Sequence, residues 1–282
     1  MSTKVVWRGY KVELTTLEPF RIGGAGHVLS DINNPVVMLK GDLPVIPGTS
    51  LKGAWRSQME RFLIDYLGIS LEKGEERGLK PCIPASEITP DERALIGKYK
   101  RKKEKDRYSN DHSPCTYDNK SDYICPACYL LGAMTLQGFV RVPFLFPVEG
   151  QEELETLLYS IREDRAKGGA AKGQNRDWPV INPGVKFEGM IEVLEKDELK
   201  NWYFGQERRE LKHKNLDRWL KDTHWSKENI LADLFKKCLE SIEILGGFKS
   251  KGCGRVSIAI DLTPQSDYQS QLIARYKESS IS

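Results

Sequence analysis

Hydrophobic and polar positions follow a strand-like period at the start of the chain. Residues 5–22, "VVWRGYKVELTTLEPFRI", alternate loosely and are rich in β-forming side chains, so we expect a first strand or hairpin arm there. Glycine and asparagine recur in residues 23–34, which predicts a flexible, exposed loop. The next segment, "PVVMLKGDLPVIPG", predicts a short hairpin with Gly41 and Asp42 at its tip.

Two later segments have the period of an amphipathic helix. The first runs from Ser50 to Leu67, with Thr49 or Ser50 as its candidate cap and Gly68 after its end. The second runs from about residue 227 to residue 245. The apolar face predicted for the first helix consists of Leu51, Trp55, Met59, Phe62, Leu63 and Tyr66.

The other apolar segments have the length and side chains of strands. They cover residues 139–148, 185–195 and 256–262. A short helix is expected near 151–163. The order strand, helix, strands, strand, helix, strand is that of an α+β, ferredoxin-like (RRM-like) palm with insertions. We therefore expect one elaborated domain over residues 1–264, followed by a polar tail over 265–282.

Composition places the chain among globular proteins. It has 282 residues, of which 39% are hydrophobic and 29% charged. No apolar run approaches the ~20 residues that a membrane span needs, and no signal-peptide stretch is present, so we expect a cytoplasmic protein without membrane contacts. The 43 basic and 40 acidic residues give a net charge of +3, which is too small to indicate nucleic acid by itself.

Residues 69–128 differ from the rest, because apolar periodicity fades, charge rises and four of the six cysteines occur there. Within this insertion, the run 98–107 holds seven basic and two acidic residues and is expected to attract RNA non-specifically. The spacing H-x2-C-x9-C-x2-C predicts a structural Zn²⁺ site, with Cys82 as a fifth candidate that could replace a ligand. The four ligands so predicted are His112, Cys115, Cys125 and Cys128.

A second candidate site lies where the first helix begins. Residues 46–56, "IPGTSLKGAWR", place a helix N-terminus, with its unpaired N–H groups and positive dipole end, beside basic side chains. Thr49 and Ser50 offer hydroxyls, and Lys52 and Arg56 put two cations on one face. This pattern suits a polyphosphate backbone, and it also suits an ordinary capped helix with solvated basic residues.

Near the end of the chain, residues 246–255 read "GGFKSKGCGR" and contain four glycines in ten positions. Lys249 and Lys251 lie between these glycines and Arg255 directly follows the last, and the glycines permit close approach of a phosphate backbone. The segment is not a nucleotide-binding P-loop, because it follows a helix and precedes a strand. A tight turn without a ligand is the alternative interpretation.

Together these stretches resemble the RAMP (repeat-associated mysterious protein) superfamily of CRISPR systems. Within it, "RIGG…SDINNPVV…LPVIPGTSLKGAWR" is similar to the repeated backbone subunit of type III effector complexes. The resemblance covers residues 5–67 and 228–262, and the middle of the chain through "CPACYLLGAM". It implies an RNA-recognition-like palm with inserted elements, and RNA contacts that include Arg21 and Ser250.

Asp31 follows the first glycine-rich loop, where an aspartate needs no role beyond forming a turn. The resemblance implies a second role, because the Asp at the matching place in the family's backbone subunit is needed to cut target RNA. One carboxylate would take the proton from a ribose 2′-hydroxyl, or position Mg²⁺ or another divalent metal. His27 is the rival base, since some family members that process guide RNA use a His without metal.

Residues 164–184 resemble the family's thumb-like element, which lies over the guide–target duplex. Lys167, Lys172 and Arg176 have a spacing that suits phosphate contact, and a surface loop is the alternative.

The sequence therefore predicts a guide-RNA-binding backbone subunit of a type III CRISPR complex that cleaves target RNA. Its expected partners are guide RNA, target RNA, other effector-complex subunits and copies of itself stacked along the guide. Two alternatives stay open: a stand-alone guide-RNA-processing endoribonuclease, and a structural RNA-binding subunit without catalytic activity.

Overall fold

The structure is a computed structural model. It describes residues 5–23, 36–39, 43–67, 79–82, 115, 117, 124–133, 135–160, 163–164, 168–170, 176–208, 216–221 and 225–265.

The chain forms two compact units. The first comprises Met1–Val5, Met59–Val140 and Glu195–Ile230, and the second comprises Val6–Gln58, Arg141–Leu194 and Leu231–Ser282. The prediction of one elaborated domain stays a prediction.

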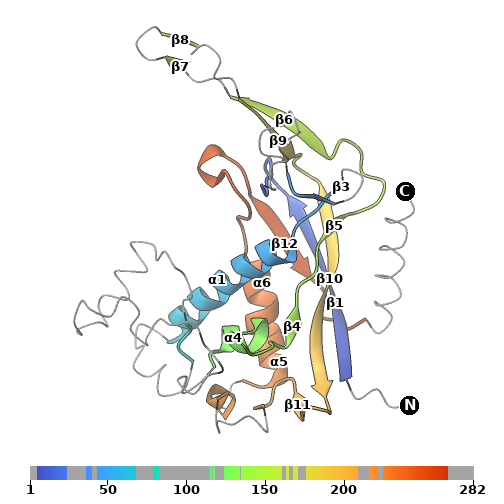
Figure 1. Cartoon of the computed structure of the whole chain (residues 1–282), viewed down its shortest axis with the longest axis vertical. Coiled ribbons are helices and arrows are strands. Elements are labelled where there is room, and N and C mark those ends of the chain that lie inside the picture. Colours follow the sequence, from blue (N-terminus) through green and yellow to red (C-terminus); the bar gives the residue numbers. More distant parts are fainter. Residues whose placement is uncertain are drawn as a thin grey trace, which may run out of the picture. The chain divides into compact units, whose positions relative to one another are not determined.

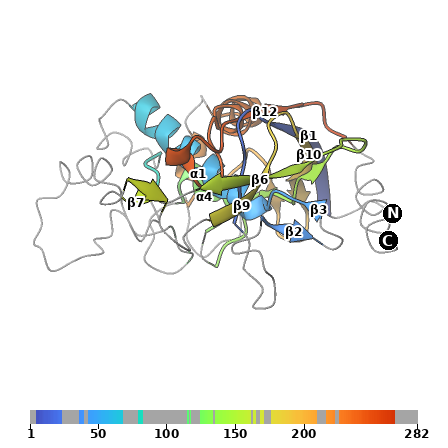
Figure 2. The ribbon, with the colours of Figure 1, turned by 90° about the horizontal axis from the view of Figure 1, so that it is seen from above.

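Most of one antiparallel sheet belongs to the second unit (Figure 1 and Figure 2). Strand β1 (Val5–Thr16) lies between β10 (Lys186–Asp197) and β12 (Val256–Ile260), and short strands β4 (Val140–Arg141) and β5 (Phe146–Pro147) pair with β10. Burial alternates along β1 and β12, so one face of each strand points into the core. The three main strands coincide with the predicted strand segments.

Helix α1 (Gly48–Leu67) confirms the first predicted helix. The side chains of four of its predicted apolar residues are fully buried: Leu51, Trp55, Met59 and Leu63. Tyr66, at the far end of the helix, is 52% exposed, and its ring stacks on that of Phe62. The helix begins at Gly48, where it passes close to the backbone at Val142. A Cβ at position 48 would lie 2.0 Å from the Val142 carbonyl oxygen.

The second predicted helix is present but shorter than expected. It consists of α5 (Lys227–Asn229), a π-helical stretch (Ile230–Lys237) and α6 (Cys238–Glu240). Ser226 caps its N-terminus, because the Ser226 hydroxyl accepts a hydrogen bond from the Asn229 amide. The indole Nε1 of Trp55 donates a hydrogen bond of 2.8 Å to the Leu234 carbonyl, which joins this helix to α1 within the second unit.

A long β-hairpin occupies a region where a helix and a loop were expected. Strand β6 (Glu155–Ser160) pairs antiparallel with β9 (Arg176–Ile181), and the small pair β7 (Glu163–Asp164) and β8 (Gly169–Ala170) lies between them in sequence (Figure 1). The helix predicted near 151–163 was therefore wrong. Its Glu and Leu residues favour a helix locally, but pairing with the aromatic and β-branched side chains of β9 favours a strand.

The structure also contains the predicted short hairpin and parts of the strand predicted over 139–148. The short hairpin is confirmed by β2 (Met38–Leu39) and β3 (Leu43–Pro44), which pair antiparallel. The strand predicted over 139–148 is interrupted between β4 and β5, where Pro143 has no N–H to donate to a ladder.

The first unit has an aromatic core around α4 (Pro126–Leu131), all of whose residues are buried. The ring of Tyr129 stacks on Phe139 and meets Trp219 edge to face. Strand β11 (Trp202–Tyr203) pairs with the last residues of β10, and a 3-10 turn spans Arg218–Lys221. These ring contacts pack α4 into the core of the first unit.

The mixed α and β class with antiparallel sheets is confirmed. No helix in the described part of the chain is long and apolar enough to cross a membrane.

Candidate functional site

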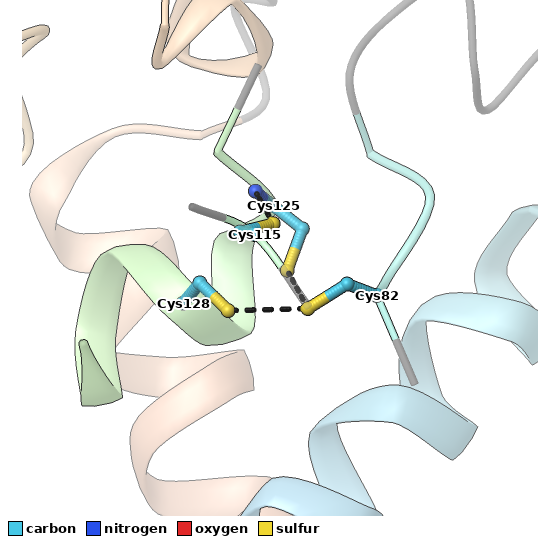
Figure 3. A group of neighbouring side chains, drawn as sticks. All are labelled: Cys82, Cys115, Cys125 and Cys128. Atoms are coloured by element: carbon cyan, nitrogen blue, oxygen red, sulfur yellow. Dashed lines mark hydrogen bonds between the residues drawn. The ribbon is translucent and has the colours of Figure 1, made fainter. Parts of the chain in front are cut away.

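Four cysteines meet in the first unit (Figure 3). Cys128 lies on α4, Cys125 directly precedes it, and Cys82 and Cys115 come from separate parts of the chain. The four sulfur atoms all lie within 4.8 Å of one another, and all four side chains are buried. The Sγ atoms of Cys82 and Cys128 are 3.2 Å apart.

This arrangement has the chemistry of a zinc site. Sulfur atoms about 2.3 Å from a central Zn²⁺ would be about 3.8 Å apart at tetrahedral corners. The Sγ atoms of Cys82 and Cys125 are 3.7 Å apart, close to that spacing. The residues present therefore fit a metal such as zinc, with four thiolates as its ligands. Such a fully ligated site leaves no open position for a substrate, so its role would be structural.

Burial and hydrogen bonds among the four cysteines shift the pKa values of their thiols. Burial raises the pKa of the Cys125 thiol well above its usual value, and neighbouring cysteines raise it further. The hydrogen bond with Cys115 lowers the pKa of Cys82. A metal would replace the protons that these groups otherwise share.

Three of the four ligands predicted from the H-x2-C-x9-C-x2-C spacing lie in this cluster. The fourth sulfur belongs to Cys82, which the sequence offered as a replacement for His112 or Cys115. His112 lies outside the described residues.

The glycine-rich loop before β12 forms the second candidate site. Residues Lys249–Lys251 make one 3-10 turn, and all three side chains are exposed. The loop is anchored from both ends: the Gly247 amide donates to the Arg21 carbonyl, and the Gly254 amide donates to the Pro19 carbonyl. Gly246 has φ +87°, and a Cβ there would lie 2.3 Å from that same carbonyl oxygen of Arg21, so the position requires glycine.

Arg21 lies beneath this loop with only 3% of its surface exposed. Its Nη1 donates a hydrogen bond of 2.9 Å to the Pro179 carbonyl on β9, and its guanidinium carbon is 5.1 Å from the ring centroid of Phe248. Burial lowers the pKa of the guanidinium. Arg21, predicted as an RNA contact, thus joins the loop to the base of the hairpin.

Two aromatic residues of this region were missed at the sequence level. Trp178 on β9 meets Phe248 edge to face with 5.2 Å between ring centroids, and both rings are half-buried. The ammonium of Lys251 lies 4.3 Å from the Trp178 ring centroid. The only available signal was an aromatic residue inside each of two basic stretches, because nothing in the sequence indicates that they meet.

Arg255 lies where the loop enters β12. Its side chain is exposed and forms an ion pair with Glu18, with 3.2 Å between Nε and Oε1. The Glu18 and Leu17 amides both donate to the Arg255 carbonyl. Arg255 therefore also ties the loop to the segment that follows β1.

The helix start holds the remaining described candidates. Thr49 is exposed, and Ser50, Lys52 and Arg56 are half-buried in the first two turns of α1. The Ser50 amide donates to the Pro47 carbonyl. All of these residues belong to the second unit, as do the glycine-rich loop and the hairpin.

The other candidates are not described by the structure. Asp31, His27, Lys167 and Lys172 lie outside the described residues, and for Arg176 only the backbone is described, opposite Ser160 in the hairpin. Gly23 and Val36, which precede and follow the segment that contains Asp31, form a β-bridge.

One family model matches most of the chain. The RAMP superfamily model matches residues 13–257, which include the helix start, the cysteines, the hairpin and the glycine-rich loop. No curated protein matches the chain in sequence. Since the match covers well over half of the chain, the chain belongs to the RAMP superfamily, and this membership supports a CRISPR-associated RNA-binding role.

Proposed function

We propose that this chain is a guide-RNA-binding backbone subunit of a type III CRISPR interference complex. The observation that carries the proposal is the exposed basic turn Lys249–Lys251, anchored by Arg21 to the base of the β6–β9 hairpin. Its exposed lysines suit a phosphate chain. The β6–β9 hairpin projects from the sheet, as a thumb-like element would (Figure 1).

The strand order supports a ferredoxin-like palm. Along the sheet the strands run β12, β1 and β10, and then β4, β5 and the short β11, each of which pairs with β10. In chain order the first strand is β1, the second is β4 with β5, the third is β10 and the fourth is β12. The fourth strand lies beside the first, the first beside the third, and the third beside the second. Helices α1 and α5–α6 connect the strands as they would in a βαββαβ unit.

Guide binding of this kind would be largely independent of sequence. Lys side chains and backbone N–H groups contact phosphates, which are the same at every nucleotide, whereas base edges carry the sequence. The guide would thus be held by its backbone, leaving its bases to pair with a target. Other effector subunits and further copies of this chain would bind along the same guide.

The proposal includes target cleavage at Asp31. The ribose 2′-oxygen would attack the adjacent phosphorus as its proton passes to the Asp31 carboxylate, the P–O5′ bond would break, and the 5′-oxygen would take up a proton. The products would end in a 2′,3′-cyclic phosphate and a 5′-hydroxyl. A divalent metal such as Mg²⁺ would supply charge stabilisation when bound.

The experiment compares complexes assembled on guide and target RNA with the parent chain and with Asp31→Asn. Asparagine keeps the shape of the side chain but removes its charge and basicity. The parent complex should cut the target at a fixed spacing in a metal-dependent manner, while the variant complex should assemble equally well and cut at least 100-fold more slowly, the order expected for loss of a general base.

His27→Ala is the matched variant, since it removes the rival base from the same segment. Target cutting by Asp31→Asn at the parent rate would show that Asp31 is a turn residue. Site-specific cutting of repeat RNA in EDTA, abolished by His27→Ala, would support a stand-alone guide-processing enzyme instead.

We also propose that Cys82, Cys115, Cys125 and Cys128 hold one structural zinc. The four buried sulfurs within 4.8 Å support this assignment. The zinc would replace part of a hydrophobic core where the sequence between α1 and α4 is poor in apolar residues.

A further inference from the structure

We propose that Trp178 and Phe248 form a platform on which one base of the bound RNA stacks, while Lys251 holds a neighbouring phosphate. This inference rests on the proposed RNA-binding function and assigns a base contact to the same surface. The two aromatic residues lie 70 positions apart in sequence and come from different elements, β9 and the glycine-rich loop.

The platform is built at the surface of the second unit. The rings of Trp178 and Phe248 are half-buried and meet at an interplanar angle of 66°. Lys251 is exposed, and its Nζ atom lies 4.3 Å from the Trp178 centroid and 4.6 Å from the Phe248 centroid. A flexible ammonium group therefore contacts both aromatic rings.

The backbone places Phe248 here at a cost. Phe248 has φ +59°, a left-handed conformation that is unfavourable for a bulky residue. The buried guanidinium of Arg21 lies against the Phe248 ring and donates a hydrogen bond to the Pro179 carbonyl. Strain of this kind persists where surrounding contacts over-determine the conformation, and it often accompanies ligand contacts.

Single-stranded RNA is the occupant that fits these groups. Every base offers a π-face for stacking on an aromatic ring, and every nucleotide brings a phosphate. Lys249 and Lys251 supply positive charge beside the rings. A phosphate would attract the Lys251 ammonium away from the Trp178 face, and the base of the same nucleotide would then occupy that face.

The test measures binding of two short RNAs of equal length, one complete and one abasic. Both carry the same phosphates, so their difference in affinity isolates the contribution of the bases. We expect the parent protein to bind the abasic RNA about 5- to 150-fold more weakly, as one stacked base contributes. Trp178→Ala should lose most of this difference, whereas Trp178→Phe should keep much of it.

Salt dependence separates the two roles within the platform. Trp178→Ala removes no charge, so the slope of log affinity against log salt should stay unchanged. Lys251→Ala removes one phosphate contact and should flatten the slope by about 0.7 for a single strand. Tyr159→Ala is the matched aromatic control, because Tyr159 is exposed on β6 opposite Asp177, one pair away from Trp178, and it should keep the full difference between the two RNAs.

The outcomes distinguish this inference from the function on which it rests. If the parent protein binds neither RNA, the RNA-binding function is wrong and the platform falls with it. If the parent binds RNA but shows no abasic difference, or if folded Trp178→Ala retains the full difference, the function stands and the platform is wrong. The abasic comparison on the parent protein needs no variant to fold.

Discussion

At the scale of single residues, Arg208 and Asp217 form a buried ion pair in the first unit. Both side chains are fully buried, and two charge-assisted hydrogen bonds of 2.9 and 2.7 Å join guanidinium and carboxylate. The guanidinium carbon also lies 5.1 Å from the ring centroid of Tyr129 on α4. The pair thus fixes the segment around it against the helix that carries Cys128.

Asp217→Asn should therefore destabilise the protein. The substitution keeps the shape but leaves the Arg208 charge buried without its carboxylate, which typically costs about 3–5 kcal/mol. Urea unfolding followed by tryptophan fluorescence measures the loss. Glu198→Gln is the control, since it breaks only an exposed pair with Lys196 and should leave the midpoint unchanged. Equal midpoints for the two variants would contradict the structural role of the buried pair.

At the scale of elements, the start of α4 holds two of the four cysteines proposed to bind zinc. Protein purified without a histidine tag should contain about one zinc per chain. Cys125→Ser and Cys128→Ser should each lose the zinc and lower the melting temperature, because the metal contributes to folding of this region. Elemental analysis and thermal unfolding measure the two effects.

Two variants serve as controls for the metal site. Cys238→Ser changes a buried cysteine outside the cluster, and His112→Ala removes the remaining candidate ligand. Both should retain zinc. A parent protein that contains no metal when freshly prepared and reduced would contradict the assignment, and loss of zinc from His112→Ala would contradict the four-cysteine set.

The sequence predicted those elements whose signal is local. The helical period of α1 and the C-x2-C pair at Cys125 and Cys128 can each be recognised in a short stretch of sequence. The structure has a helix over the predicted residues and brings both cysteines into the cluster. The β6 strand was misread, because its Glu and Leu content favours a helix until β9 pairs with it. The meeting of Trp178 with Phe248 depends on the tertiary fold, so no local pattern could predict it.

The cysteine site shows the same division between local and distant information. Cys115, Cys125 and Cys128 followed from spacing, whereas the choice of Cys82 required the fold. Its sulfur comes from a segment more than 30 residues before Cys115. Spacing therefore predicted the chemistry of the site, and the structure supplies the identity of its fourth sulfur.

For the whole molecule, the distribution of charge matters more than its sum. A net charge of +3 among 83 charged side chains gives little overall attraction for RNA. The second unit, however, contains the basic turn Lys249–Lys251, the basic start of α1 and the β6–β9 hairpin. We therefore expect RNA affinity to depend on a few local cations.

The central claim is that these cations bind an RNA backbone, and the salt dependence of binding tests it most directly. The double variants Lys249→Ala with Lys251→Ala, and Lys52→Ala with Arg56→Ala, are compared with a charge-matched control, Lys196→Ala with Lys236→Ala. The control lysines lie in surface pairs with Glu198 and Glu240. Affinity for single-stranded RNA is measured at several salt concentrations.

Each test variant should bind more weakly than the parent and flatten the slope of log affinity against log salt by about 1.4, because each cation that contacts a phosphate contributes about 0.7. The control variant, with the same net charge, should keep the parent slope. Parent-like slopes and affinities for both test variants, or an equal loss in the control, would contradict the proposal that this chain holds a guide RNA through these residues.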